Sequence, residues 1–171
     1  MADILIVVDM QKDFIDGSLG TREAVGIVEN VKNKISMYSK SGKKIFFTRD
    51  THFENYLETF EGKHLPVVHC VKDSEGWQID RKLTEENVDA KVIDKYTFGE
   101  TNWASILGNE FESVEICGLC TDICVISNAL IIRAFYPDKD IVVDSSCCAG
   151  VTPQKHECAL EVMRSCQIDV I

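Results

Sequence analysis

Short β-rich runs alternate with helical stretches along the whole chain, and this alternation limits the possible folds more than any other feature. The run Ile4–Val8 is wholly apolar, as expected for a strand that is buried on both faces of a sheet. Further strands are predicted at 44–48, 91–93, 114–117, 139–143 and 167–171, and helices at 21–39, 123–134 and 152–166. Because helical crossovers join parallel strands, the sequence predicts a doubly wound α/β fold, a six-stranded parallel sheet with helices on both faces.

Length and composition narrow the class of protein further. With 171 residues the chain suits one domain, which we expect to span 1–171. Its 28 acidic residues outnumber the 18 basic ones, which argues against nucleic acid and membrane surfaces as partners, because both need a basic face. No secretion signal begins the chain, and no apolar run is long enough to span a membrane. We therefore expect a cytoplasmic protein whose eight cysteines form no disulfide framework.

Polar residues follow each of the first four predicted strands. Asp9 follows the first, Asp50 and His52 the second, Lys95 the third, and the turn 120–124 the fourth. Sheets of this type carry their chemistry beyond the carboxyl ends of the strands, so these residues should meet on one rim. There Asp9 suits a general base, and Lys95 can stabilise negative charge. No Gly-rich phosphate loop follows the first strand, which disfavours nucleotide binding.

Cys124 is the candidate nucleophile among the cysteines. It stands at the predicted start of the 123–134 helix, where backbone N–H groups and the helix dipole lower the pKa of a thiol and can hold an oxyanion. A buried helical cysteine is the alternative interpretation. Cys117-x-x-Cys120 is a rival motif for thiol chemistry, but a redox motif should open a helix, whereas Cys117 falls within a strand.

A metal site is predicted from histidines and a carboxylate around the long irregular segment 51–78. Asp50 and His52 point to the same side of an extended segment, and His69 follows across the loop. Two imidazoles and a carboxylate suit Zn²⁺, Fe²⁺ or Mn²⁺. His64 competes with His69 as the third ligand, and Glu61 is a possible fourth.

Several segments together resemble a known family. They are 6–14 (Ile-Val-Val-Asp-Met-Gln-Lys-Asp-Phe), 48–52 (Thr-Arg-Asp-Thr-His), 69–71 (His-Cys-Val), Lys95 and 118–125 (Gly-Leu-Cys-Thr-Asp-Ile-Cys-Val). In this order, and over nearly the whole chain, they resemble the isochorismatase-like cysteine hydrolases, and within these the nicotinamidases most closely.

The resemblance implies roles for residues on the predicted rim. It implies a catalytic triad of Asp9, Lys95 and Cys124. It also implies a cis peptide bond between Leu119 and Cys120, with the N–H groups of Cys120 and Cys124 as the oxyanion hole. The cofactor that it implies is one divalent metal ion, commonly zinc, on the aspartate and the two histidines proposed above.

The resemblance to the family specifies the substrate less precisely than it specifies the reaction. We expect Phe14 and Leu119 to contact the substrate ring. Nicotinamidases often carry a ring-stacking Trp three residues before the third metal ligand, and here that position is Pro66.

The sequence thus predicts a metal-containing cysteine amidase that converts nicotinamide to nicotinate and ammonia through a thioester, as in NAD salvage. The expected partner is a small-molecule amide, and we expect the chain to form a homo-oligomer. Two alternatives stay open: a cysteine hydrolase of carbamoyl or ureido compounds, and a non-catalytic or redox-responsive thiol protein. His156, late in the chain, is expected to be exposed to solvent.

Overall fold

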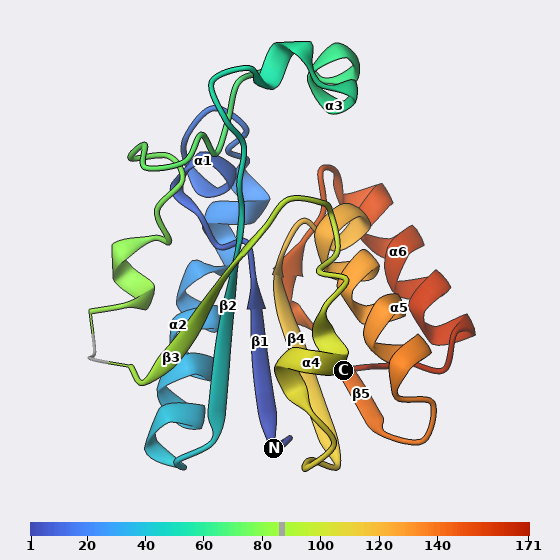
Figure 1. The fold of residues 1–171 in the computed structure, drawn as a ribbon. Coiled ribbons are helices and arrows are strands. Elements are labelled where there is room, and N and C mark those ends of the chain that lie inside the picture. Colours follow the sequence, from blue (N-terminus) through green and yellow to red (C-terminus); the bar gives the residue numbers. More distant parts are fainter. Residues whose placement is uncertain (86–87) are drawn as a thin grey trace.

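The six described strands lie in one parallel sheet (Figure 1). The computed structural model describes residues 1–85 and 88–171. The strands are β1 (Ile4–Val8), β2 (Lys44–Asp50), β3 (Ala90–Lys95), β4 (Ser113–Leu119), β5 (Asp140–Ala149) and β6 (Asp169–Val170), in the order β3-β2-β1-β4-β5-β6. Because β1 pairs with β2 on one side and with β4 on the other, the chain reverses its winding direction between β1 and β4. The carboxyl ends of these two strands therefore define the switch point.

Helices cover both faces of the sheet, which confirms the predicted fold class (Figure 1). They are α1 (Lys12–Ile15), α2 (Arg22–Lys40), α3 (Phe60–His64), α4 (Trp103–Leu107), α5 (Ile126–Phe135) and α6 (Pro153–Ser165), with short turns η1 (Tyr56–Glu58), η2 (Arg81–Leu83) and η3 (Thr121–Val125). Helix α2 packs against β1, β2, β4 and β5 on one face, and α4, α5 and α6 lie together on the other. None of the described helices has the length and apolar composition that crossing a bilayer needs.

Four strands, β2, β3, β4 and β5, extend further than the sequence pattern predicts, and contacts at β4 and β5 show how. β4 continues through Gly118, whose φ of 120° is readily adopted only by glycine, and a Cβ there would collide with the Val8 carbonyl oxygen. β5 continues past Val143 to Ala149, because Lys34 of α2 pairs with Asp144 at 2.7 Å and Ser145 donates its N–H to the carbonyl of Ile171. These polar residues end the apolar pattern but not the strand.

The segment after β2 forms an overhang above the carboxyl ends of the strands and carries η1 and α3 (Figure 1). Backbone hydrogen bonds close its base: His52 donates to the carbonyl of Cys70 at 2.9 Å, and Lys72 donates to that of His52 at 2.9 Å. Thr59 caps α3 by accepting a hydrogen bond from the N–H of Gly62. Residues 52 and 69 are thereby brought together from opposite ends of a long loop.

Candidate active site

Asp9, Lys95 and Cys124 meet at the switch point. Asp9 follows β1 directly, and its Oδ2 atom lies 2.7 Å from Nζ of Lys95, the last residue of β3. Lys95 Nζ donates to Sγ of Cys124 at 3.5 Å, and Thr48 Oγ1 donates to Oδ1 of Asp9 at 2.7 Å. All three side chains of this group are buried. Asp9 has a φ of 47°, a strained value for a residue that is not glycine.

Burial dominates the electrostatics of this group. It raises the pKa of Asp9, although the nearby Lys95 ammonium lowers that pKa. Burial also raises the pKa of the Cys124 thiol well above its usual range, and Asp9 and Asp50 add to this effect while Lys95 opposes it. The expectation of a lowered thiol pKa at a helix start is therefore wrong for the free protein. A raised pKa favours the neutral thiol, and Asp9 of the same group can accept its proton.

The turn that carries Cys124 is wider than an α-helical turn. Residues 121–125 form the π-helical turn η3, and the α-helix begins at Ile126 rather than at residue 123. The carbonyl of Cys120 accepts hydrogen bonds from the N–H groups of Ile123 and Val125, at 3.0 and 3.1 Å. Asn128 Nδ2 donates to the carbonyl of Cys124 at 2.8 Å. Such π-type turns are frequent at functional sites.

The peptide bond between Leu119 and Cys120 is cis, as the resemblance implied. Cys120 and Cys124 both line the same cavity, as do Phe14 and Leu119, the two expected substrate contacts. Leu65 also lines the cavity.

The expectation from the sequence that His156 is exposed to solvent is wrong. His156 is half-buried, and its Nδ1 atom lies 2.8 Å from Oγ1 of Thr121, the first residue of η3. Asp122 Oδ1 accepts a hydrogen bond from the N–H of Val151 at 2.9 Å. The start of α6 therefore holds the turn that carries Cys124, a long-range contact that no local sequence pattern signals.

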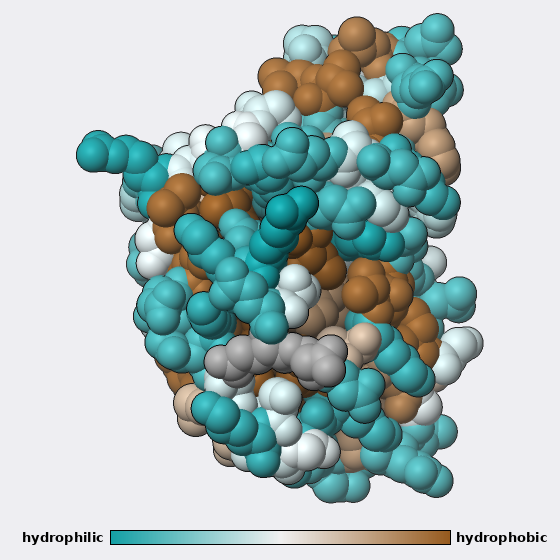
Figure 2. Space-filling view, turned by 90° about the vertical axis from the view of Figure 1, so that its left-hand side faces the viewer, coloured by the Kyte–Doolittle hydropathy of each residue, from teal (hydrophilic) through white to brown (hydrophobic). Residues whose placement is uncertain are grey.

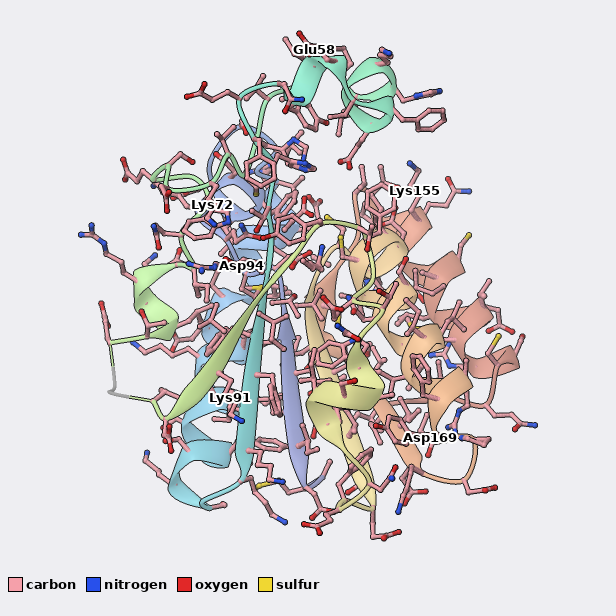
Figure 3. All side chains as sticks on the ribbon, in the orientation of Figure 1. Glu58, Lys72, Lys91, Asp94, Lys155 and Asp169 are labelled. Atoms are coloured by element: carbon pink, nitrogen blue, oxygen red, sulfur yellow. The ribbon has the colours of Figure 1, made fainter. Side chains whose placement is uncertain are left out.

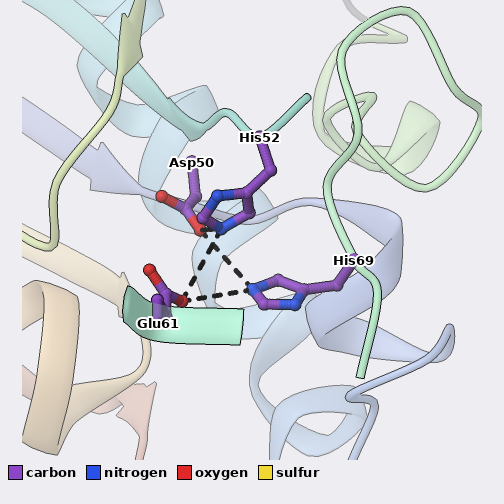
Figure 4. A group of neighbouring side chains, drawn as sticks. All are labelled: Asp50, His52, Glu61 and His69. Carbon is purple, nitrogen blue, oxygen red and sulfur yellow. Dashed lines mark ion pairs between the residues drawn. The ribbon is translucent and has the colours of Figure 1, made fainter. Parts of the chain in front are cut away.

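Asp50, His52, Glu61 and His69 form a cluster of potential metal ligands (Figure 4). One ligand atom from each lies within 4.8 Å of the others. His64, the rival candidate, lies outside this cluster, and its Nδ1 atom lies 2.8 Å from the Phe60 carbonyl oxygen in its own helix.

The geometry of the cluster fits a tetrahedral metal site. Glu61 Oε1 lies 3.6 Å from His52 Nε2 and 3.7 Å from His69 Nε2, and Asp50 Oδ2 lies 3.7 Å from His69 Nε2 and 2.9 Å from His52 Nε2. Ligand atoms about 2.0–2.1 Å from a tetrahedral ion are about 3.4 Å apart. The three distances of 3.6–3.7 Å would therefore need to change little when a metal binds. His69 Nδ1 lies 2.8 Å from the Val67 carbonyl oxygen, which leaves Nε2 free for a metal. His52 Nε2 is buried and forms no hydrogen bond, although Asp50 Oδ2 lies 2.9 Å away, so this nitrogen is available as a metal ligand.

Charge in the cluster also suits a cation. Although burial favours the neutral form, His52 and His69 hold the pKa of the Asp50 carboxyl well below its usual range. Burial raises the pKa of Glu61, with the negative charge of Asp50 adding to the effect and the two histidines opposing it. A divalent cation would relieve the repulsion between the two carboxylates.

Gln11 and Asp13 hold the ligands in place, a role that sequence reasoning missed for Gln11. Nε2 of the fully buried Gln11 donates to the carbonyls of Asp50 and Trp77, both at 2.9 Å, and its Oε1 accepts the Asp50 N–H at 2.7 Å. Asp13 Oδ2 accepts the N–H of Cys70, next to a ligand histidine, at 2.8 Å. A polar amide directly after a buried strand is the signal that could have identified Gln11.

The fold and the site define an α/β enzyme in which a cysteine in contact with a buried lysine–aspartate pair lines a cavity together with Asp50, Glu61 and His69 of the metal-ligand cluster. The model of the Isochorismatase domain matches residues 3–171. The chain therefore belongs to the isochorismatase family, and we identify it as a hydrolase of that family.

Known proteins similar to this chain agree with that family. The pyrazinamidase of Pyrococcus horikoshii, solved in complex with zinc, is 33% identical with a TM-score of 0.85, and the match covers 100% of this chain and 99% of that one. An uncharacterised isochorismatase family protein of Bacillus subtilis (strain 168), PncA, is 26% identical over 94% of this chain and 93% of its own. The N-carbamoylsarcosine amidase of Thermoplasma acidophilum is 26% identical with a TM-score of 0.80, over 99% of this chain and 95% of that one.

Proposed function

We propose that this protein is a metal-dependent cysteine amidase that hydrolyses a small aromatic primary amide, nicotinamide first. The observation that carries this proposal is the contact between Asp9, Lys95 and Cys124 at the end of a cavity that Asp50 and His69 also line. A nucleophile, a proton acceptor and a metal-ligand cluster then face one substrate. The similarity to a pyrazinamidase solved with zinc supports the same reaction class.

The residues suggest the following reaction. Cys124 Sγ attacks the amide carbonyl carbon while Asp9 accepts the thiol proton. The proton passes to the amide nitrogen, ammonia leaves, and the acyl group stays on sulfur as a thioester. Water then attacks the thioester, releasing the carboxylic acid and restoring the thiol. Lys95 offsets the negative charge on Asp9 throughout, and the N–H groups of Cys120 and Cys124 are the proposed donors to the oxyanion.

Asp50, His52, Glu61 and His69 would hold the divalent ion, zinc first, with iron and manganese as alternatives. Bound there, the ion supplies a Lewis acid that can hold a pyridine nitrogen or polarise water. Phe14, whose ring centroid lies 5.5 Å from that of His69, offers an aromatic surface to a planar substrate in the same region. With nicotinamide as substrate the reaction yields nicotinate, which would place the enzyme in cytoplasmic NAD salvage.

Ammonia release from nicotinamide, pyrazinamide and a panel of other amides tests the proposal, with metal content measured on the same preparation. Cys124→Ser should lower turnover by more than about 10³-fold while metal content and folding stay nearly unchanged. Cys120→Ser is the matched control and should have a mild effect, because that residue acts through its backbone N–H. Full activity in Cys124→Ala would overturn the proposal.

A carbamoyl or ureido substrate is the second candidate, favoured by the similarity to the Thermoplasma N-carbamoylsarcosine amidase. The same residues would attack a carbamoyl carbon. Carbon dioxide would then form together with ammonia, whereas a simple amide yields ammonia and a stable carboxylate. Measuring both products on the same panel separates the two candidates.

A further inference from the structure

The cavity that contains Cys124 is larger than nicotinamide needs. Its volume is about 670 Å³. Cavities of about 300–1,000 Å³ hold drug-sized ligands, and a pyridine ring with one carboxamide is much smaller. A substrate that fills the cavity must therefore extend well beyond the reacting amide.

The cavity has a buried inner end and an open outer end. The inner end contains Asp50, His69, Leu119 and Cys124, each at most 4% exposed. The outer end is apolar and exposed: Phe60 is 80%, Tyr96 59%, Phe98 45%, Val151 40% and Leu65 38% exposed. Figure 2 shows hydrophobic side chains gathered over α3, at the top of the molecule.

A lysine lies at this outer end. Lys155 lines the cavity from the first turn of α6, at the end of that helix that faces α3 (Figure 3). No carboxylate among residues 1–85 and 88–171 forms an ion pair with Lys155. By contrast, Lys95 at the inner end is paired with both Asp9 and Asp50. Lys155 is exposed at the cavity mouth, so its ammonium can attract an anionic group there although the protein as a whole carries a net charge of −10.

We propose that the outer end of the cavity is a second subsite, in which Lys155 binds the anionic substituent of an extended amide substrate. The proposal rests on the proposed amidase function and specifies its substrate class. The amide lies at Cys124, an apolar linker contacts Phe60, Phe98 and Val151, and a carboxylate or phosphate pairs with the Lys155 ammonium. Because Lys155 is exposed, this is a solvent-screened ion pair, and the apolar contacts of the linker supply the rest of the binding free energy.

Two matched probes test this subsite on the metal-loaded protein. One is a benzamide with a short alkyl chain that ends in a carboxylate, and the other is the same benzamide with a chain that ends in a hydroxyl group. Binding is measured by calorimetry on a Cys124→Ser background, and ammonia release is measured on the otherwise native enzyme. The variant Lys155→Met removes the charge and keeps the apolar stem. Lys91→Met is its control, since Lys91 is exposed on β3 at the far end of the sheet (Figure 3).

Lys155→Met should weaken binding of the carboxylate probe about three- to fivefold and leave the hydroxyl probe and nicotinamide within about twofold. Lys91→Met should change none of them. High salt should reduce the preference for the carboxylate probe, because the pair lies at the cavity mouth. The subsite would be overturned if Lys155→Met weakened the binding of both probes equally, or if the native protein bound the carboxylate probe no more tightly than the hydroxyl probe. Because binding is measured without turnover, a subsite that discriminates while no amide is hydrolysed would refute the amidase function and leave the subsite standing.

Discussion

The Oδ2 atom of Asp9 lies 2.7 Å from the Nζ atom of Lys95, and neither side chain is exposed to solvent. Two charges removed from water are tolerated only because they neutralise each other. The protein thus contains a buried ion pair at the carboxyl ends of β1 and β3, and the sulfur of Cys124 is in contact with it. Removing one member of this pair would therefore leave the other charge buried without its partner.

Substituting one member of this ion pair should lower the free energy of unfolding more than substituting both members together. Lys95→Met leaves a buried carboxylate unpaired and should lower the free energy of unfolding by about 3–5 kcal/mol. The double variant Asp9→Asn/Lys95→Met should recover much of that loss, because Asp9 no longer carries a charge and Asp50 keeps its contacts with His52 and His69, but it should stay inactive. Urea unfolding of the native protein, both single variants and the double variant measures the coupling. Additive losses would contradict the paired-charge account.

Thiol labelling should follow burial rather than catalytic role. At neutral pH, iodoacetamide should modify the exposed Cys158 and Cys166 before Cys124, because burial raises the pKa of Cys124 and keeps it protonated. A group with a raised pKa forms thiolate only at higher pH, so labelling at Cys124 should increase as the pH rises above neutral. Mass spectrometry of peptides from a pH series measures the order. Faster labelling of Cys124 at neutral pH would show that its thiolate forms more readily than the structure indicates.

Metal binding should depend on the described cluster and not on the nearby rival histidine. His52→Ala and His69→Ala should each reduce bound metal to well below one ion per chain, because each removes a ligand atom of the four-residue cluster. His64→Ala is the matched control, and elemental analysis after dialysis measures the outcome. If His64→Ala removes the metal as well, the assignment of the ligands is wrong.

Chelation should also lower the melting temperature of the native protein, since Asp50 and Glu61 then repel each other.

Gln11 should affect metal affinity without touching the metal. Gln11→Ala removes three hydrogen bonds to the backbone of residues 50 and 77 and should weaken metal binding by about 10–100-fold. A competition titration with a chromogenic chelator measures this affinity directly. Gln78→Ala, at an exposed position on the same loop, is the control and should leave affinity nearly unchanged. Native affinity in Gln11→Ala would show that Asp50 is held in place by its strand alone.

Much of the rim could be predicted from the sequence because parallel strands end at one edge of the sheet. Asp9, Asp50 and Lys95 each follow or end a strand, so the strand pattern alone places them together. The choice between His64 and His69 could not be made in this way. It depends on the hydrogen bonds between residues 52 and 70 that close the long loop, and loop closure leaves no periodic pattern.

Electrostatic and helical details escaped prediction for a different reason. The sequence places Cys124 at a helix start, but its pKa depends on burial by the whole fold and on two carboxylates from other strands. The π-helical turn η3 is held in part by Asn128, whose side-chain Nδ2 donates a hydrogen bond to the carbonyl of Cys124. Both effects come from contacts that form only after the sheet and helices have packed.

His156 should act on the reaction through Thr121, without contact to substrate or metal. The hydrogen bond between Nδ1 of His156 and Oγ1 of Thr121 holds the first residue of the turn that ends with Cys124 and Val125. His156→Ala should lower kcat about tenfold with little change in KM or metal content, as expected for the loss of one partly buried hydrogen bond. His156→Asn keeps a polar group near the hydroxyl and should restore part of the loss. Thr121→Val should have a similar effect, and combining it with His156→Ala should add little, because both changes remove the same bond. Steady-state kinetics of the four variants measure this coupling, and independent, additive losses would show that the bond does not position the turn.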